Sequence, residues 1–209
     1  TTFVEQYNDA ILHISVDASG SMGGDKWNNT MTAVVAICKA TSMISGLDVV
    51  VSFRTTHYSS RVGQPLVAIG FDSRVDKFRK IENLWPSLHP GGTTPEGLCY
   101  EAIMKDFVGG TNNRDSYFLN FSDGQPMFSG DGFEYYGDSA LHHTKKQVKE
   151  IIKKGISVMS YFVGDSEYDR TRNMDDFKTM YGKDAEFVDV TKVSSLAKTM
   201  NNLFLEKGK

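Results

Sequence analysis

Short apolar runs alternate with longer segments of helical periodicity along most of the chain. Five of the runs are rich in β-branched and aromatic residues and predict buried strands. A sixth run contains Pro65, which cannot donate a hydrogen bond within a sheet and therefore indicates an edge strand. The predicted strands cover residues 10–16, 47–53, 64–71, 115–121, 156–163 and 186–190.

The segments between these runs place apolar residues three and four positions apart, which is typical of amphipathic helices. Several carry boundary signals. Gly46 and Gly155 each follow a helical pattern, and Thr94 with Pro95 is suited to a helix start. The predicted helices cover residues 25–45, 74–83, 95–107, 139–154, 169–181 and 193–204.

Strands that alternate with helices of this length predict an α/β fold with a parallel sheet. We expect a Rossmann-like open sheet of six strands, five parallel and one antiparallel at an edge, with helices on both faces. Residues 1–209 fit one domain with a core at about residues 10–204. The sequence begins without methionine, so we expect this domain to be excised from a longer chain.

Composition narrows the classes of function. A formal net charge of −3 gives no electrostatic footprint for nucleic acid, and the basic segment at residues 145–154 fits the solvated face of a helix. No apolar run approaches 18 residues, and no signal peptide precedes the first strand. Cys38 and Cys99 both lie in helical patterns and are expected to be free thiols, which favours the cytoplasm.

Oxygen-bearing side chains lie in three loops, each next to the end of a strand or the start of a helix. Asp17, Ser19 and Ser21 follow the first strand, a Gly-Gly-Thr-Thr loop spans residues 91–94, and Asp123 follows the fourth strand. The carboxyl ends of parallel strands meet at one edge of the sheet, where ligands bind. Two carboxylates at that edge repel each other unless a positive charge lies between them. None of these motifs contains a basic residue, so we expect a divalent cation there.

Carboxylates, hydroxyls and water form a hard-oxygen set, which suits Mg²⁺. Mn²⁺ or Ca²⁺ can substitute in such a set. The loops contain no histidine or cysteine, which disfavours Zn²⁺. The sequence therefore predicts a magnesium site, although Asp17 and the two serines also fit an N-cap or a turn.

The order Asp17-Ala18-Ser19-Gly20-Ser21, then the threonine loop, then Ser122-Asp123-Gly124 resembles the metal-ion-dependent adhesion site of von Willebrand factor A domains. The resemblance covers nearly the whole chain in element order. It implies a non-catalytic, metal-dependent protein-binding domain. In that family the two serines and a threonine bind the metal directly, and the aspartates bind it directly or through water.

The threonine that this resemblance assigns is open between Thr93 and Thr94. If Thr94 caps the following helix, its hydroxyl is partly committed and Thr93 faces the metal. Related intracellular domains with Thr-Pro-x-Gly loops favour Thr94 instead. The expected metal residues are therefore Asp17, Ser19, Ser21, Thr93, Thr94 and Asp123.

The Asp-Gly-x-Pro element and the Thr-Pro-Glu-Gly run look most similar to the bacterial and phage branch around CobT-type cobaltochelatase subunits. This resemblance implies an AAA+ ATPase partner. Three functions are open. The first is binding of a protein partner whose Asp or Glu completes the metal shell. The second is an assembly or regulatory module of an AAA+ complex, and the third is a metal-dependent phosphoesterase.

Other features of the sequence each allow a structural and a functional interpretation. Glu96 fits a helix-dipole residue better than a base, and His142-His143 fits a surface pair better than a second metal site. Trp27 and the aromatic segment at residues 127–137 are either core or recognition surface. Ser19 as a nucleophile is disfavoured, because no Gly-x-Ser-x-Gly pattern surrounds it.

Overall fold

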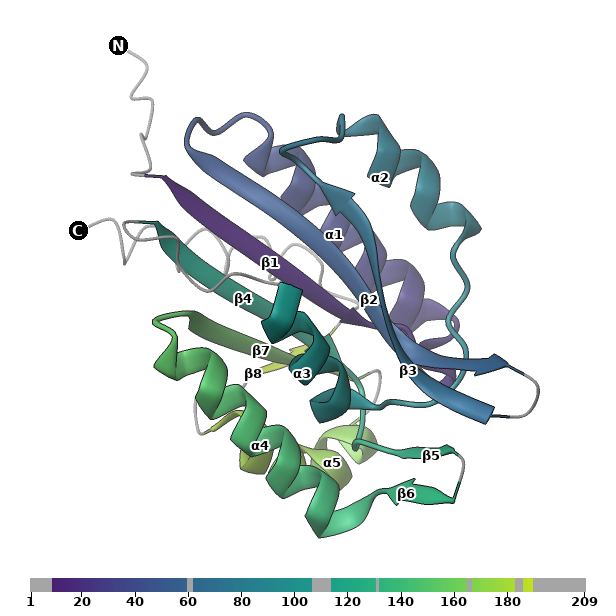
Figure 1. Ribbon diagram of the computed structural model, residues 1–209. Helices are drawn as coiled ribbons and strands as arrows, with labels where there is room; N and C mark the ends of the chain where they lie inside the picture. Colours follow the sequence, from purple (N-terminus) through teal and green to yellow (C-terminus); the bar gives the residue numbers. More distant parts are fainter. Residues whose placement is uncertain are drawn as a thin grey trace.

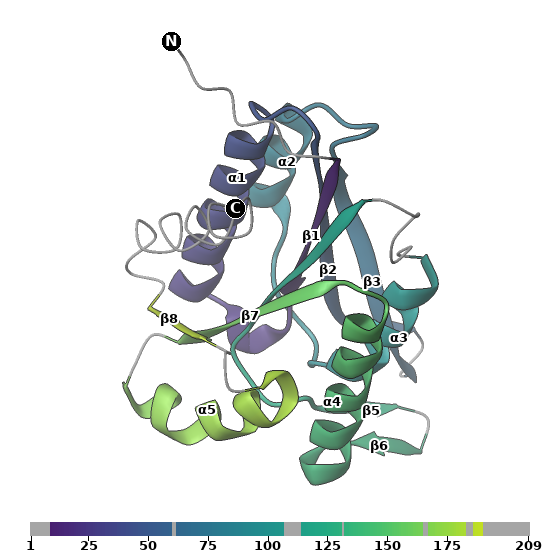
Figure 2. The same cartoon turned by 90° about the vertical axis from the view of Figure 1, so that its left-hand side faces the viewer.

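The computed structural model describes residues 9–59, 62–106, 114–130, 132–164, 167–182 and 186–189. At its centre is a six-stranded sheet in the order β3-β2-β1-β4-β7-β8, in which only the pair β2–β3 is antiparallel. Helices cover both faces of the sheet (Figures 1 and 2). The predicted α/β architecture is thus confirmed, including the antiparallel edge strand that contains Pro65.

The strands of the central sheet are β1 (Ala10–Asp17), β2 (Leu47–Ser59), β3 (Val62–Asp72), β4 (Asp115–Ser122), β7 (Ser157–Gly164) and β8 (Glu186–Asp189). The helices are α1 (Asp25–Thr41), α2 (Arg79–Leu84), α3 (Glu96–Asp106), α4 (Gly137–Lys153) and α5 (Glu167–Tyr181). Single 3₁₀ turns lie at Gly20–Met22 and Trp85–Ser87. The helix expected at residues 193–204 lies outside the described residues.

Two helix predictions are wrong at their ends. The helix expected at residues 74–83 begins only at Arg79, because Asp72 accepts a hydrogen bond from the Arg74 backbone N–H and Asp76 accepts one from the Asp72 N–H. These bonds hold a turn instead of a helix. The first helix ends at Thr41 rather than at residue 45.

The sequence also gave no indication of a small hairpin between β4 and α4. It consists of β5 (Phe128–Gly130) and β6 (Phe133–Tyr135), paired antiparallel. Strands of three residues are too short to show a periodic pattern. Figure 1 shows the hairpin at the end of the sheet where β2 turns into β3.

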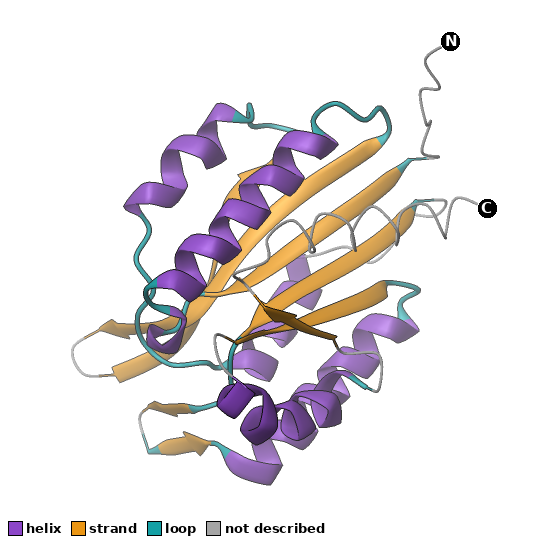
Figure 3. Cartoon of the chain, turned by 180° about the vertical axis from the view of Figure 1, so that it is seen from behind, coloured by secondary structure: helices purple, strands orange, loops and turns teal. Residues whose placement is uncertain are grey.

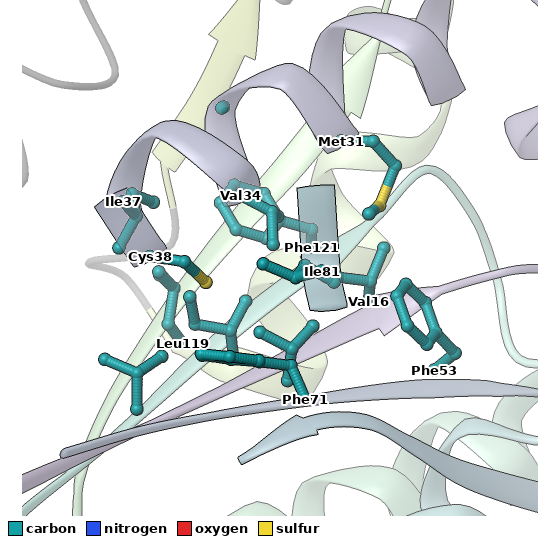
Figure 4. Close-up of a cluster of buried hydrophobic side chains, with 14 of the residues drawn as sticks. Val16, Met31, Val34, Ile37, Cys38, Phe53, Phe71, Ile81, Leu119 and Phe121 are labelled. Atoms are coloured by element: carbon teal, nitrogen blue, oxygen red, sulfur yellow. The ribbon is translucent and has the colours of Figure 1, made fainter. Parts of the chain in front are cut away.

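One face of the sheet is apolar and lies under α1 and α2, as Figure 3 shows from behind. Its side chains alternate along the strands with those of the other face. Val16, Phe53 and Phe121 pack there against Met31 and Val34 of α1 (Figure 4). Trp27 belongs to the same cluster and donates its indole N–H to the Leu88 carbonyl, so it is a core residue.

The opposite face of the same strands is also buried, but it is mixed: a polar row lies beside an apolar cluster around Phe118. Register pairs place one polar row across four strands: Ser52, Ser15, Asn120 and Ser160. The amide atoms of Asn120 and the hydroxyl of Ser160 find no hydrogen-bond partner among the described residues. The sequence predicted that β2 is buried on both faces, which is confirmed, but on this face the buried residues include Ser52 and Arg54. Helices α3 and α4 cover it (Figure 2).

His13 lies on this face and is 4% exposed. Its Nε2 atom is 2.6 Å from the Ser52 hydroxyl, and its ring meets Phe118 edge-on at 5.3 Å between centroids. Burial, and secondarily the charge of Arg54, lowers the pKa of His13 from 6.5 to about 3. The folded protein therefore keeps this histidine neutral where the unfolded chain protonates it.

A pH-dependent loss of stability follows. Between pH 6.5 and about 3 the unfolded state binds a proton that the folded state refuses, so the free energy of unfolding falls as the pH falls. The slope from one such group reaches about 1.4 kcal/mol per pH unit. Chemical denaturation across this range should show a shallower slope for His13→Leu than for the wild type.

Exposed His57 provides the matched control, and His57→Leu should keep the wild-type slope. Other groups titrate in the same range, so the difference between curves is the quantity to compare. Parallel curves for the wild type and His13→Leu would contradict the assignment of this slope to His13.

Candidate metal centre

Three loops meet at the carboxyl ends of β1 and β4, and backbone hydrogen bonds join them. The Gly91 N–H donates to the Ala18 carbonyl at 2.8 Å, and the Gly20 N–H donates to the Gly92 carbonyl at 3.1 Å. Gly92 has φ +75°, and a Cβ atom there would lie 2.8 Å from the Thr56 carbonyl oxygen, so this close approach requires glycine. The first and second loops are therefore fixed against each other.

A string of hydrogen bonds connects the two aspartates that the sequence selects. Asp17 accepts from the Ser19 backbone N–H at 2.8 Å, and the Ser19 and Ser21 hydroxyls are 3.1 Å apart. The Ser21 hydroxyl then donates to Asp123 at 2.8 Å. The second oxygen of Asp17 accepts from the Ser122 hydroxyl at 2.9 Å. Four of the six expected metal residues thus form one contiguous oxygen-rich cluster.

The hydroxyls of Thr93 and Thr94 differ in their hydrogen bonds. The Thr93 hydroxyl is 2.6 Å from the hydroxyl of Thr56 on β2. Thr94 is 6% exposed, and its carbonyl accepts from the Met127 N–H at 2.9 Å. The Thr94 hydroxyl makes no hydrogen bond within the part of the chain that the structure describes. Of the two hydroxyls, that of Thr94 is the one without a competing partner.

The three motifs contain no basic residue, but two basic side chains from elsewhere in the chain lie near the cluster. The Lys26 ammonium lies 3.0 Å from Asp123, and the Arg54 guanidinium lies close enough to Asp17 to act on its charge. Burial nevertheless raises the pKa of both aspartates, and for Asp123 the charge of Asp17 raises it further. The two carboxylates still destabilise each other, as expected for a pair that a divalent cation would stabilise.

Glu96 lies in the first turn of α3, as the helix-dipole interpretation expects, but it is also part of a buried network. It is 0% exposed, and its carboxylate accepts from Arg54 at 2.8 Å. The hydroxyls of Tyr100 on α3 and Tyr181 on α5 also donate to it, the first at 3.2 Å. Ser122, which holds Asp17, lies 3.5 Å from its other oxygen.

Arg54 is the centre of this network. Its side chain donates to the Ser15 hydroxyl at 2.9 Å and to the Phe121 carbonyl at 3.1 Å, and its own carbonyl accepts from the Ala18 N–H at 2.9 Å. Together with Glu96 it therefore touches the base of all three loops. Sequence reasoning missed Arg54, although a lone arginine directly after the apolar run of β2 was a usable signal.

The two adjacent histidines, His142 and His143, have different hydrogen-bond partners. The His143 ring bonds to Tyr135 at 2.9 Å and to Glu101 at 3.1 Å, whereas His142 bonds to the Asp138 carbonyl. Within the described residues, no group of three or more His, Cys, Asp or Glu side chains is placed to hold a metal. The second metal site considered for the histidine pair therefore finds no support.

The aromatic segment after Asp123 divides between core and surface. Tyr135 is 4% exposed and packs against α4, but Phe133 and Tyr136 are more than half exposed, as is Met127. Both interpretations of this segment are thus correct for part of it. Cys38 and Cys99 are free and buried, as predicted. Among the described residues, no helix is long and apolar enough to cross a membrane.

Comparison of the sequence with known proteins finds a relative but no family. A scan against protein-family models finds no match. The uncharacterized protein YojO of Bacillus subtilis (strain 168) is 27% identical over 186 residues, which is 86% of this chain. The chain spans only 27% of YojO, so it is similar to a part of that protein.

Solved structures share the architecture at low identity. Manganese-loaded TRAP protein of Plasmodium vivax has a TM-score of 0.63 at 13% identity, covering 90% of this chain and 72% of that chain. Proximal thread matrix protein 1 of the mussel byssus, with a zinc-occupied MIDAS motif, has a TM-score of 0.63 at 13% identity, covering 94% of this chain and 46% of its own. The chain thus has an α/β fold similar to that of these proteins.

Removal of the charge on Glu96 should destabilise the protein strongly. In Glu96→Gln the fully buried guanidinium loses its counter-ion, which typically costs about 3–5 kcal/mol. The double variant Arg54→Met/Glu96→Leu removes both charges and should be more stable than Glu96→Gln. Urea denaturation of the three proteins measures these differences.

The exposed pair of Lys153 and Glu150 supplies the comparison, since Glu150→Gln should leave stability unchanged. Equal stability of Glu96→Gln and Glu150→Gln would show that the buried pair has no such role.

Proposed function

We propose that this chain is a domain that binds another protein through a divalent cation. The observation that carries the proposal is the continuous cluster of two buried carboxylates and two serine hydroxyls at one edge of the sheet. Thr94 lies in the loop that is hydrogen-bonded to the first loop, and its hydroxyl has no hydrogen-bond partner among the described residues. Such a cluster is unfavourable by itself and becomes favourable when a cation binds.

The donor set fits Mg²⁺ or Mn²⁺. All the side-chain donors are oxygens, and hydroxyl and carboxylate oxygens with water are the ligands that these hard cations prefer. Asp17, Ser19, Ser21, Thr94 and Asp123 would hold the cation. The solved structure of TRAP with manganese and that of the byssus protein with zinc at its MIDAS motif support a divalent cation in this fold.

We infer that the protein supplies ligands from one side only, because the five residues lie at the end of β1, just after it, just before α3 and just after β4, at one end of the sheet. An Asp or Glu of a partner protein would complete the coordination from the other side. A cation held this way acts as a fixed positive charge that attracts a carboxylate. The exposed side chains of Met127 and Phe133 follow Asp123 along the chain and provide apolar contact area.

We infer no catalytic role for the domain. The Ser19 hydroxyl is bonded to Ser21 and the Asp17 carboxylate to backbone and hydroxyl donors, an arrangement that holds these groups rather than activating a nucleophile. Assembly with an AAA+ ATPase and metal-dependent phosphoester hydrolysis stay predictions of the sequence. Copurification of an ATPase and turnover of a phosphate ester with Mn²⁺ are their respective tests.

Calorimetric titration with Mg²⁺ and Mn²⁺ tests the site directly. We expect saturable binding at one site in the wild type and its loss in Asp123→Ala and Ser19→Ala. The two threonines give a matched pair, because Val keeps the shape of Thr and removes only the hydroxyl. Thr94→Val should weaken metal binding by tenfold or more, on the order of 1.4 kcal/mol, whereas Thr93→Val should leave it unchanged.

Circular dichroism and denaturation curves of each variant serve as the control for folding. Absence of metal binding at millimolar concentration in a folded wild-type protein would count against the proposed function. An effect of Thr93→Val but not of Thr94→Val would reverse the assignment of the threonine.

A further inference from the structure

Lys26 occupies an unusual position beside the candidate metal centre. It is the second residue of α1, and its ammonium lies 3.0 Å from one oxygen of Asp123 while Ser21 donates to the other oxygen. The side chain of Asp123 is 1% exposed and that of Lys26 is 13% exposed. This ion pair is therefore largely removed from water and differs from the exposed pairs that contribute little.

The location of Lys26 is unfavourable for the helix itself. The first turn of a helix carries a partial positive charge and stabilises acidic side chains, so a lysine there is repelled. Lys26 interacts favourably with Asp123, which lies on another element. A cation that binds at Asp123 thus meets a positive side chain that already contacts the same carboxylate.

The effect of Lys26 on the net charge of the candidate metal centre follows from the charged side chains there. Arg54 and Glu96 neutralise each other in their buried pair. Among the described residues, ionised Asp17 and Asp123 contribute two negative charges and Lys26 one positive charge, which gives these three side chains a net charge of −1. A divalent cation would change the net charge to +1, and one carboxylate would then make it zero. Without Lys26, the cation alone would neutralise the cluster.

We propose that Lys26 sets the charge of the centre, so that it weakens the binding of the divalent cation and strengthens the binding of a carboxylate to the loaded centre. This inference rests on the proposed function. Lysine suits both roles, because its ammonium is a compact charge on a flexible stem that can leave Asp123 and remain at the solvent-exposed rim. The residue would make a partner's carboxylate part of the charge balance of the site.

The proposal predicts effects of opposite sign from one substitution. Lys26→Gln should bind Mg²⁺ about tenfold more tightly, because it removes a unit charge within a few ångströms of the cation. The same variant, saturated with Mg²⁺, should bind acetate several-fold more weakly. Calorimetry measures the first affinity. Amide chemical shifts in ¹⁵N-labelled protein measure the second, with chloride replacing acetate at constant ionic strength.

Two variants control the experiment. Lys149→Gln removes an exposed lysine from α4, and it should leave both affinities at the wild-type values. Lys26→Arg keeps the charge and should stay within about threefold of the wild type for both ligands, whereas a role in packing alone would not be rescued in this way. Higher salt should reduce both effects of Lys26→Gln.

The results of these titrations distinguish the role of Lys26 from the proposed function itself. Opposite changes in Mg²⁺ and acetate affinity support the proposal. Changes in the same direction, or none, in a Lys26→Gln protein that still binds Mg²⁺ overturn it and leave the proposed function intact. Failure of the folded wild-type protein to bind Mg²⁺ or Mn²⁺ instead overturns the proposed function itself.

Discussion

The fold and the candidate centre both depend on the buried ion pair between Arg54 and Glu96. A planar guanidinium has several donors at fixed angles, and here they reach β1, β4 and the segment that begins α3. Lysine, with a single ammonium, would not join three elements in this way. The loops at the end of the sheet are thus attached to one rigid group, the guanidinium of Arg54, which belongs to the protein itself.

Burying such a pair is expensive, because both charges lose their hydration. The surroundings offset this cost with hydroxyl donors from Tyr100, Tyr181 and Ser122, which complete the hydrogen bonding of Glu96. A polar network of this kind stabilises the native arrangement only when nearly all its members are bonded. It also carries α5 into the same network, so a helix distant in sequence contacts the groups that hold Asp17.

The sequence predicted the order of the elements and the composition of the centre, because both follow from local patterns. Apolar runs and helix boundaries are local, and so is the spacing of Asp17, Ser19 and Ser21. What it could not predict depends on contacts between distant segments. Lys26 reaches Asp123 across 97 positions, and Glu96 reaches Tyr181 across 85. Neither pair has a periodic signature, so Lys26 was overlooked and Glu96 was interpreted only as a helix-dipole residue.

The second strand shows the same limit. Its burial on both faces was predicted correctly, but the β-branched residues gave no sign that Ser52 and Arg54 would form a buried polar network. Similarly, the choice between Thr93 and Thr94 depends on Thr56, which lies 37 positions away. Local sequence identifies which residue types gather, and only the three-dimensional arrangement shows which of their atoms are already engaged.

The two faces of the central sheet should differ in how they tolerate change over evolutionary time. An apolar core accepts exchanges that conserve volume, so the side under α1 can drift while the fold is maintained. The polar row has fewer solutions where its members are bonded, since exchange of Ser15 or Ser52 leaves Arg54 or His13 without a hydrogen bond. Distant members of such a lineage would therefore resemble one another most on one side of a single sheet, and a search that weighs all positions equally would recognise them poorly.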